Sequence, residues 1–313
     1  MSVLGRRFKS ELFTAAMLAG GLLLAASLQA GQKDSVRAVG ETHRQVVEDW
    51  RSNRHAGLSA ADGYLSQVGL EWLKEGENRV GSAPDNDVRI ADGPAIWGSV
   101  FLENGQIRFV RAENSEATID GELLNEARLI ADTEGEATTV RNGTFSFYVI
   151  FRGSFALRVK DSQAVARLGF AGMDNYPISE KWLIDGRFVP APTGTTIEIV
   201  NVLGQVSDSS VLGTFEFEMK GKSHSLLGLA DEDAEDVWFI FADRTSGHGT
   251  YGAGRFLHSN GMPANGRLTV DFNKAYNPPC AFNPFSTCPL PPQRNRLDLE
   301  VMAGERDFHP GAG

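Results

Sequence analysis

The stretch T-T-V-R-N-G-T-F-S-F-Y-V-I-F, residues 138–151, decides the fold that the sequence predicts. Asn-Gly is the residue pair that a two-residue type I′ turn demands, because both loop positions need a positive φ. Thr138–Arg141 and Thr144–Phe151 flank this pair and are rich in β-branched and aromatic residues. Apolar side chains occupy both alternating sets of positions after Phe145, so we expect this strand to bury both faces. The stretch therefore predicts an antiparallel hairpin in the middle of a β-sandwich.

Short strands and turns continue on both sides of this hairpin. A second hairpin is predicted at Trp97–Leu102 and Gln106–Val110, around Asn104-Gly105. The pattern loosens between Asp161 and Trp182, which we interpret as the crossing between two β units. Beyond it, strands are predicted over Trp182–Val189, Thr195–Val202, Gly213–Lys220, Val237–Ala242, Thr250–Leu257, Leu268–Phe272 and Leu297–Met302.

A chain of 313 residues is long for one domain, which agrees with two units. No internal repeat of fixed period is visible, so the pattern argues against solenoids and propellers. The predicted fold is all-β and mainly antiparallel, with two packed units at residues 61–165 and 175–313.

An amphipathic helix is predicted before the first β unit, over residues 31–60. Lys33–Leu58 carries a polar, charged pattern with few helix breakers and with apolar positions at Val36, Val46, Val47 and Trp50.

Residues 1–30 have the layout of an export signal. Basic residues precede the apolar run Leu12–Ala26, and small residues follow it at Ser27 and Ala30. The run has fifteen residues, fewer than the roughly 20 that span a bilayer as a helix. We therefore expect a cleaved signal, a periplasmic or extracellular protein, and no stable membrane span after signal removal.

The net charge argues against nucleic acid as a partner. Removing residues 1–30 takes away Arg6, Arg7, Lys9 and Glu11, a net of +2, so the charge changes from −10 to −12. An acidic body repels phosphate backbones and anionic lipid. The sequence also shows no P-loop, dinucleotide fingerprint or nucleophile elbow, and we predict no cofactor and no metal.

The only two cysteines, Cys280 and Cys288, lie in the proline-rich stretch 277–292. In an exported chain, an even number of cysteines is read first as a disulfide. Zinc is an alternative, but it needs further ligands, for which His248 or His258 would have to approach in space. A nucleophilic thiol paired with a histidine is a third possibility.

Two groups of polar residues are candidates for a binding site or an active site. The first ends a predicted strand and consists of Asp271, Asn273, Tyr276 and Asn277; the second surrounds a glycine-containing turn and consists of Asp243, Thr245, His248, Tyr251 and Arg255. Polar groups on rigid backbone are what a site requires. Each group also has a structural interpretation, as turn caps for the first and an Asp–Arg ion pair for the second.

Part of the first unit resembles forkhead-associated domains. The resemblance rests on Asn78–Ser82, Asn86–Ile90 and Ile96–Glu103, which match opening strands of that sandwich. Ser82 stands where the family has a phosphate-binding arginine, and Ile96–Ser99 replaces its S-R-x-H element. The resemblance therefore implies the scaffold without phosphopeptide recognition.

A second resemblance is to the bacterial and archaeal family called domain of unknown function 1684. It begins with Asp49-Trp50-Arg51, Arg54, Asp62–Leu65, Gly69–Leu73 and Gly76–Ser82. Its most distinctive part runs from Phe239 through Asp243, Gly254–Leu257, Asp271–Cys280, Thr287–Pro292 and Asn295 to Ala303-Gly304-Glu305. This resemblance implies architecture and a set of candidate residues, but no reaction.

We therefore predict a protein that binds a small molecule or an envelope partner in its C-terminal unit. The alternative is a hydrolase-type enzyme with Asp271 or His248 as base and Arg255 or Tyr276 stabilising charge. A structural role in the cell envelope is a third hypothesis. Both site hypotheses predict that Asp243, Arg255 and Tyr276 converge in one pocket.

Overall fold

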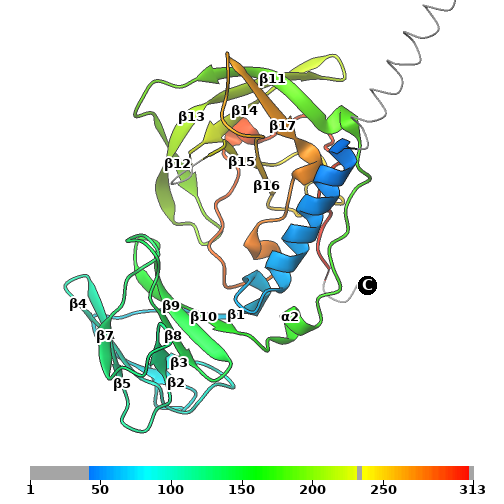
Figure 1. Cartoon of the computed structure of the whole chain (residues 1–313). Coiled ribbons are helices and arrows are strands. Elements are labelled where there is room, and N and C mark those ends of the chain that lie inside the picture. The colour runs from blue at the N-terminus through cyan, green and yellow to red at the C-terminus, as the bar shows by residue number, and fades with distance from the viewer. Residues whose placement is uncertain (1–41, 231–234, 310–313) are drawn as a thin grey trace, which may run out of the picture. The chain divides into compact units, whose positions relative to one another are not determined.

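The computed structural model describes residues 42–230 and 235–309 (Figure 1). Trp50–Gly313 forms one compact unit, and residues 42–49 are the described part of another. The predicted export signal, residues 1–30, lies outside the described residues. Within the described ranges, no helix has the length and apolar character needed to cross a membrane.

The predicted N-terminal helix is confirmed over residues 42–59, and residues 31–41 lie outside the described part. Its buried or half-buried positions are His43, Val47, Trp50, Arg51, Arg54, Leu58 and Ser59. This spacing of three and four residues is that of one face of an α-helix. Val46, expected on the apolar face, is 47% exposed.

Two five-stranded sheets form the first β region. One has the order β1-β10-β9-β8-β6, with strands Gln67–Trp72, Phe155–Asp161, Phe145–Phe151, Thr139–Asn142 and Thr118–Ile119. The other has the order β3-β2-β4-β5-β7, with strands Val88–Arg89, Gly76–Gly81, Gly98–Glu103, Gln106–Arg111 and Glu126–Arg128. All neighbouring pairs are antiparallel except β2 with β3.

The two sheets enclose a common core. Phe147 of β9 contacts Trp97 and Phe109 from the other sheet's side, with ring centroids 5.5 and 5.8 Å apart. All three side chains are fully buried. β9 buries both of its faces, as predicted for a central strand. The resemblance to forkhead-associated domains remains a prediction.

One of the two predicted turns has a different type. Asn104 and Gly105 both have a positive φ, 51° and 78°, as a type I′ turn requires. In the other hairpin, Asn142 pairs with Phe145, so the loop is Gly143-Thr144. Gly143 has φ 63° at the first loop position, which is the pattern of a type II′ turn.

The second β region is a seven-stranded antiparallel sheet. Its order is β16-β15-β14-β13-β11-β17, and β12 pairs with β13. The strands are β11 Leu183–Pro190, β12 Thr196–Val200, β13 Val206–Met219, β14 Lys222–Leu229, β15 Trp238–Phe241, β16 Arg255–His258 and β17 Arg267–Asp271. A bridge between Ser259 and Val270 joins the β16 and β17 ends of this sheet. A short helix, α2 (Val165–Leu168), precedes it.

The mainly antiparallel β fold is confirmed, with three corrections in the second region. The hairpin of β13 and β14 was missed; its two-residue loop is Lys220-Gly221, with φ 52° and 72°. The strand predicted at Thr250–Leu257 begins only at Arg255. The strand predicted at Leu297–Met302 is wrong, because this segment forms no ladder. Leu297 and Leu299 each make one backbone hydrogen bond, to Ala242 and Arg244, and the backbone of Val301 bonds to side chains.

Candidate functional site

The ion pair expected between Asp243 and Arg255 is present, and it lies in the protein interior. Arg255 Nη2 is 3.4 Å from Asp243 Oδ1, and neither side chain is exposed. Burial lowers the pKa of the Arg255 guanidinium, and the neighbouring Asp243 carboxylate acts in the opposite direction. Thr245 Oγ1 donates to Asp243 Oδ2 at 2.9 Å.

This pair holds the C-terminal segment. Arg255 donates to the carbonyl oxygens of Val301, Ala303 and Glu305, at 3.0, 2.5 and 3.3 Å. Asp243 Oδ2 accepts from the Val301 N–H at 2.6 Å. The geometry therefore supports the structural interpretation of the pair, in which its side chains bond the backbone of residues 301–305.

The first polar group also has structural partners. Asp271 caps the 3₁₀-helix Phe272–Lys274 by accepting from the Asn273 N–H at 3.0 Å. Asn273 bonds both backbone groups of Ser179 at 3.0 Å. Asn277 donates from Nδ2 to the Arg306 carbonyl at 2.7 Å, and its N–H reaches Glu305 Oε2 at 2.6 Å. These residues stabilise the chain around the expected site.

Tyr251 and His248, two residues of the second polar group, lie in separate surroundings. Tyr251 Oη donates to the Cys280 carbonyl at 3.2 Å, and burial together with Asp307 raises the pKa of its hydroxyl. His248 is exposed in the turn between β15 and β16. Neither residue is brought together with Tyr276 by any of these contacts.

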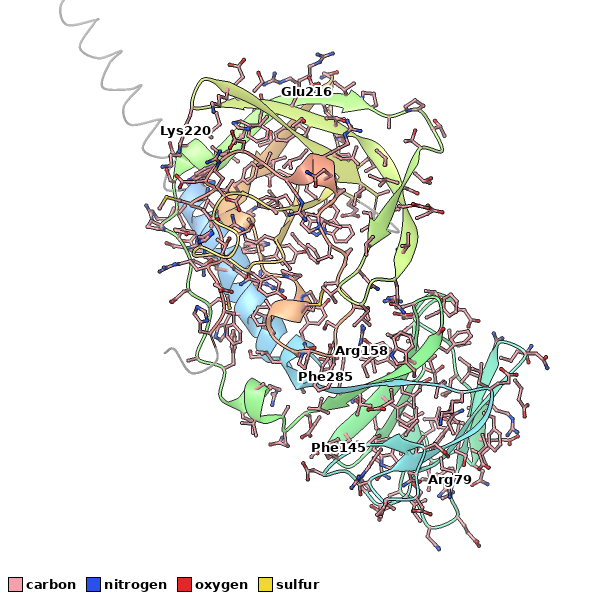
Figure 2. The ribbon with its side chains drawn as sticks, turned by 180° about the vertical axis from the view of Figure 1, so that it is seen from behind. Arg79, Phe145, Arg158, Glu216, Lys220 and Phe285 are labelled. Atoms are coloured by element: carbon pink, nitrogen blue, oxygen red, sulfur yellow. A yellow bond between two sulfur atoms is a disulfide. The ribbon has the colours of Figure 1, made fainter. Side chains whose placement is uncertain are left out.

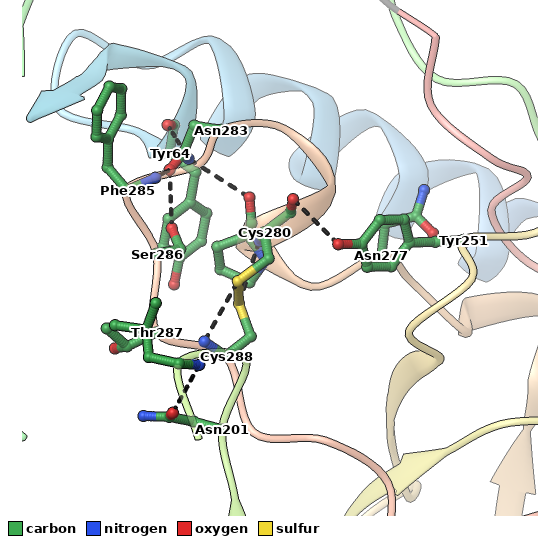
Figure 3. The surroundings of a disulfide bond; sticks show 12 residues. Tyr64, Asn201, Tyr251, Asn277, Cys280, Asn283, Phe285, Ser286, Thr287 and Cys288 are labelled. Atoms are coloured by element: carbon green, nitrogen blue, oxygen red, sulfur yellow. Dashed lines mark hydrogen bonds between the residues drawn. A yellow bond between two sulfur atoms is a disulfide. The ribbon is translucent and has the colours of Figure 1, made fainter. Parts of the chain in front are cut away.

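Cys280 and Cys288 lie at disulfide distance (Figure 3). The N–H of each cysteine also approaches the sulfur of the other, at 3.1 and 3.3 Å. Within the loop, Asn283 Nδ2 donates to the Tyr64 carbonyl at 3.0 Å. Among the described residues, no group of three or more His, Cys, Asp and Glu side chains is placed to hold a metal ion.

Replacing both Cys280 and Cys288 by serine is expected to lower the free energy of unfolding by about 2.5 kcal/mol, because an open loop has more entropy in the unfolded chain. The bridge closes a loop with a sequence separation of 8. Urea denaturation of the oxidised protein and the double variant measures the difference. Alkylation of the native protein without reductant should label neither cysteine; labelling of both would contradict the bridge.

Tyr276 lies on the other face of β16 from Arg255. Phe256 pairs with Tyr276, and their rings lie 5.8 Å apart. Neighbouring residues of a strand point to opposite faces, so Arg255 points away from Tyr276. The prediction that Asp243, Arg255 and Tyr276 share one pocket is therefore corrected.

Tyr276 is instead part of a different cluster. Its hydroxyl lies 3.0 Å from His258 Nε2, and His258 Nδ1 lies 2.8 Å from Asp236 Oδ1. From the N-terminal helix, Trp50 lies 6.1 Å from the Tyr276 ring, and the Arg54 guanidinium lies 4.7 Å from the ring centroid. These five residues bring an aromatic surface, a cation and a hydrogen-bonded acid–base pair together.

A cavity of about 340 Å³ adjoins this cluster through Trp50 and Arg54, and its lining also includes Arg51, His55, Asn175 and Glu305. Arg54 Nε pairs with Glu305 Oε1 at 3.0 Å, and Glu305 is only 1% exposed. Asn175 donates from Nδ2 to the Met173 carbonyl at 2.9 Å. The Oδ1 atom of Asn175 is buried and accepts no hydrogen bond from the described residues.

Residues 168–306 match the model of the family described as "Protein of unknown function (DUF1684)". The predicted resemblance is confirmed over these residues. A solution NMR structure of an uncharacterized protein from Haloarcula marismortui is also similar, with 28% sequence identity and a TM-score of 0.38. The similarity covers 45% of this chain and 78% of that one. The comparison with curated proteins gave no match.

The residues that match this family model include Asn175, Asp236, His258, Tyr276 and Glu305, whereas Trp50 and Arg54 precede them. The earlier part of the predicted resemblance, from Asp49 to Ser82, lies outside the matched residues.

Sequence reasoning selected Tyr276 but missed its partners Asp236 and His258. His258 had been considered only as a zinc ligand. Its pairing with Asp236 and Tyr276 depends on strand register, which no local pattern shows. Trp50 and Arg54 were among the residues of the family resemblance, and this was the signal that pointed to them.

Proposed function

We propose that the protein is exported and that it binds a small anionic ligand in the cavity beside Arg54. The charged lining of the cavity carries this proposal. It includes the guanidinium groups of Arg51 and Arg54 and the carboxylate of Glu305, in a chain whose net charge is −10. The planar donor fork of a guanidinium group matches a carboxylate, so this lining favours an anionic ligand.

The size and polarity of the cavity restrict the class of ligand. A volume of about 340 Å³ is near the lower end of the range for small-molecule sites. The buried Oδ1 of Asn175 can accept a hydrogen bond from a ligand hydroxyl, and Trp50 offers apolar surface. A sugar acid combines a carboxylate with hydroxyl donors and is the class that we propose.

Export is supported by the basic and apolar pattern of residues 1–30 and by the cysteine pair at disulfide distance. The cysteine pair alone is compatible with several compartments, so the proposal rests on both features together.

Titration calorimetry at low ionic strength with glucuronate and glucose tests the proposal, because the two sugars differ by a carboxylate. We expect glucuronate to bind at least about tenfold more tightly than glucose. Asn175→Asp adds a negative charge at the cavity and should weaken glucuronate binding by about tenfold or more. Asn53→Asp, at an exposed position of the N-terminal helix that carries Arg54, is the control with the same charge change.

Equal affinity for the two sugars, or equal weakening by both substitutions, would contradict an anion site in this cavity.

A second function, acid–base chemistry of the hydrolase type, is favoured by one observation: the contact of His258 with both Asp236 and Tyr276. It differs from the sequence-based hypothesis, which used Asp271 or His248 as the base.

A further inference from the structure

We propose that Asp236, His258 and Tyr276 form an acid–base triad in which the Tyr276 hydroxyl is a nucleophile toward activated esters. This inference rests on the second proposed function, the acid–base chemistry of His258, and it names the nucleophile and the substrate class of that chemistry.

The hydrogen-bond partners of His258 determine its protonation pattern. A carboxylate only accepts hydrogen bonds, so the contact of Nδ1 with Asp236 Oδ1 at 2.8 Å places a proton on Nδ1. In the neutral imidazole, Nε2 is then the acceptor, and it lies 3.0 Å from Tyr276 Oη. A nucleophile within reach of a base, with the base oriented by a third group, is the arrangement of nucleophilic catalysis.

Backbone pairing and ring contacts hold the side chains of His258 and Tyr276. Trp238 pairs with His258 across β15 and β16, and their rings are stacked at 6.4 Å with an interplanar angle of 21°. The His258 ring also stacks on the Tyr276 ring, with 5.9 Å between the ring centroids and an interplanar angle of 7°. Two backbone hydrogen bonds, at 2.8 and 2.9 Å, fix Tyr276 to Phe256. The contact between His258 and Tyr276 is therefore set by backbone pairing to the sheet and does not require loop closure.

The triad can be reached, and a cation lies beside it. The side chains of His258 and Asp236 are 35% and 33% exposed, and Tyr276 is half-buried. The Arg54 guanidinium lies over the Tyr276 ring, 4.7 Å from its centroid. A cation over an aromatic ring is attracted by its electron density, which is greater in the phenolate than in the phenol, so this contact favours loss of the proton.

In the proposed step, one acyl–oxygen bond forms and another breaks. Tyr276 Oη attacks the acyl carbon of the ester, and its proton moves to His258 Nε2. The bond between the acyl carbon and the leaving-group oxygen then breaks, and the leaving group departs as an alcohol with the proton from Nε2 or as a stable phenolate. The product is an acyl ester on Tyr276, from which water releases the acid.

The test uses p-nitrophenyl acetate and the purified full chain. We expect release of p-nitrophenolate in an initial burst, and peptide mass spectrometry should find one acetyl group on Tyr276. Acetylation of lysines or of other tyrosines without Tyr276 would overturn the proposal, and this measurement needs no variant.

Variants then test the relay. Tyr276→Phe should abolish the burst, and His258→Gln should slow acetylation of Tyr276 by about a hundredfold or more. Asp236→Asn should slow it less, because the imidazole remains but loses its orienting carboxylate. Tyr64→Phe, which removes a hydroxyl from an exposed tyrosine elsewhere, should leave the burst unchanged. Thermal unfolding of each variant confirms folding, and an unchanged rate in folded His258→Gln would show that the contact is only structural.

Discussion

Arg255→Ala is expected to lower the free energy of unfolding by about 3–5 kcal/mol, because it removes one partner of a buried ion pair. The guanidinium contacts the Asp243 carboxylate and three backbone carbonyls of the C-terminal segment. Without it, a carboxylate with no exposed surface loses its cation, and the three carbonyl oxygens lose their donor. Urea denaturation at equilibrium measures the loss.

Arg187→Ala is the matched control. Arg187 Nη1 lies 3.4 Å from Glu216 Oε2, the same distance as in the buried pair, but its side chain is 69% exposed and that of Glu216 is 46% exposed. An exposed pair is screened by water, so we expect a change of about 1 kcal/mol or less. Similar losses in the two variants would show that burial of Arg255 does not determine its contribution.

The buried pair of Asp243 and Arg255 explains why residues predicted to form a binding site lie in the protein interior. Asp243 and Arg255 hold residues 301–305, and Glu305 in turn pairs with Arg54 at the cavity. The polar group around Asp243 and Arg255 therefore lies in the interior and holds the segment whose Glu305 pairs with Arg54 at the cavity. Substitutions of Asp243 or Arg255 should change ligand binding only through their effect on the stability of the fold.

The sequence predicts hairpins well where the turn chemistry is local. Asn104-Gly105 has the two residues that a type I′ turn favours, and its hairpin is found. Lys220-Gly221 adopts the same positive φ values with a lysine, which carries no such signal, so β14 was missed.

At Leu297–Val301, the alternation of apolar and polar residues matches the alternation of buried and exposed side chains. It does not reveal that the backbone is held by single hydrogen bonds to Ala242 and Arg244 and by side chains, rather than by a ladder.

The candidate site is less accessible to sequence reasoning because its contacts join distant positions. Tyr276 could be selected from its polar neighbourhood, whereas the partnership with His258 follows from the pairing of Phe256 with Tyr276. Arg54 reaches Tyr276 and Glu305 only once the helix has packed. The residue types were visible in the sequence, but their distances were not.

Asn295→Ala is expected to cost about 3 kcal/mol or more, because one side chain satisfies three buried backbone groups. Asn295 Oδ1 accepts from the Leu227 N–H at 2.7 Å, and Nδ2 donates to the carbonyls of Leu227 and Ile240, both at 2.9 Å. Leu227 belongs to β14 and Ile240 to β15. Among the described residues, these strands share a single ladder pair, Leu229 with Trp238. The amide therefore joins two strands whose own ladder has opened.

Asn260→Ala is the control for this prediction, because Asn260 is exposed and the change should stay within about 0.5 kcal/mol. Asn295→Asp separates hydrogen bonding from packing. It keeps the acceptor for Leu227 but turns the donor into an oxygen that faces two carbonyls, so the ionised form should be at least as unstable as the alanine variant. Lowering the pH protonates the carboxyl group and returns one donor, and the gap between Asn295→Asp and the native protein should narrow. A pH-independent gap would show that Asn295 acts through its volume rather than through its hydrogen bonds.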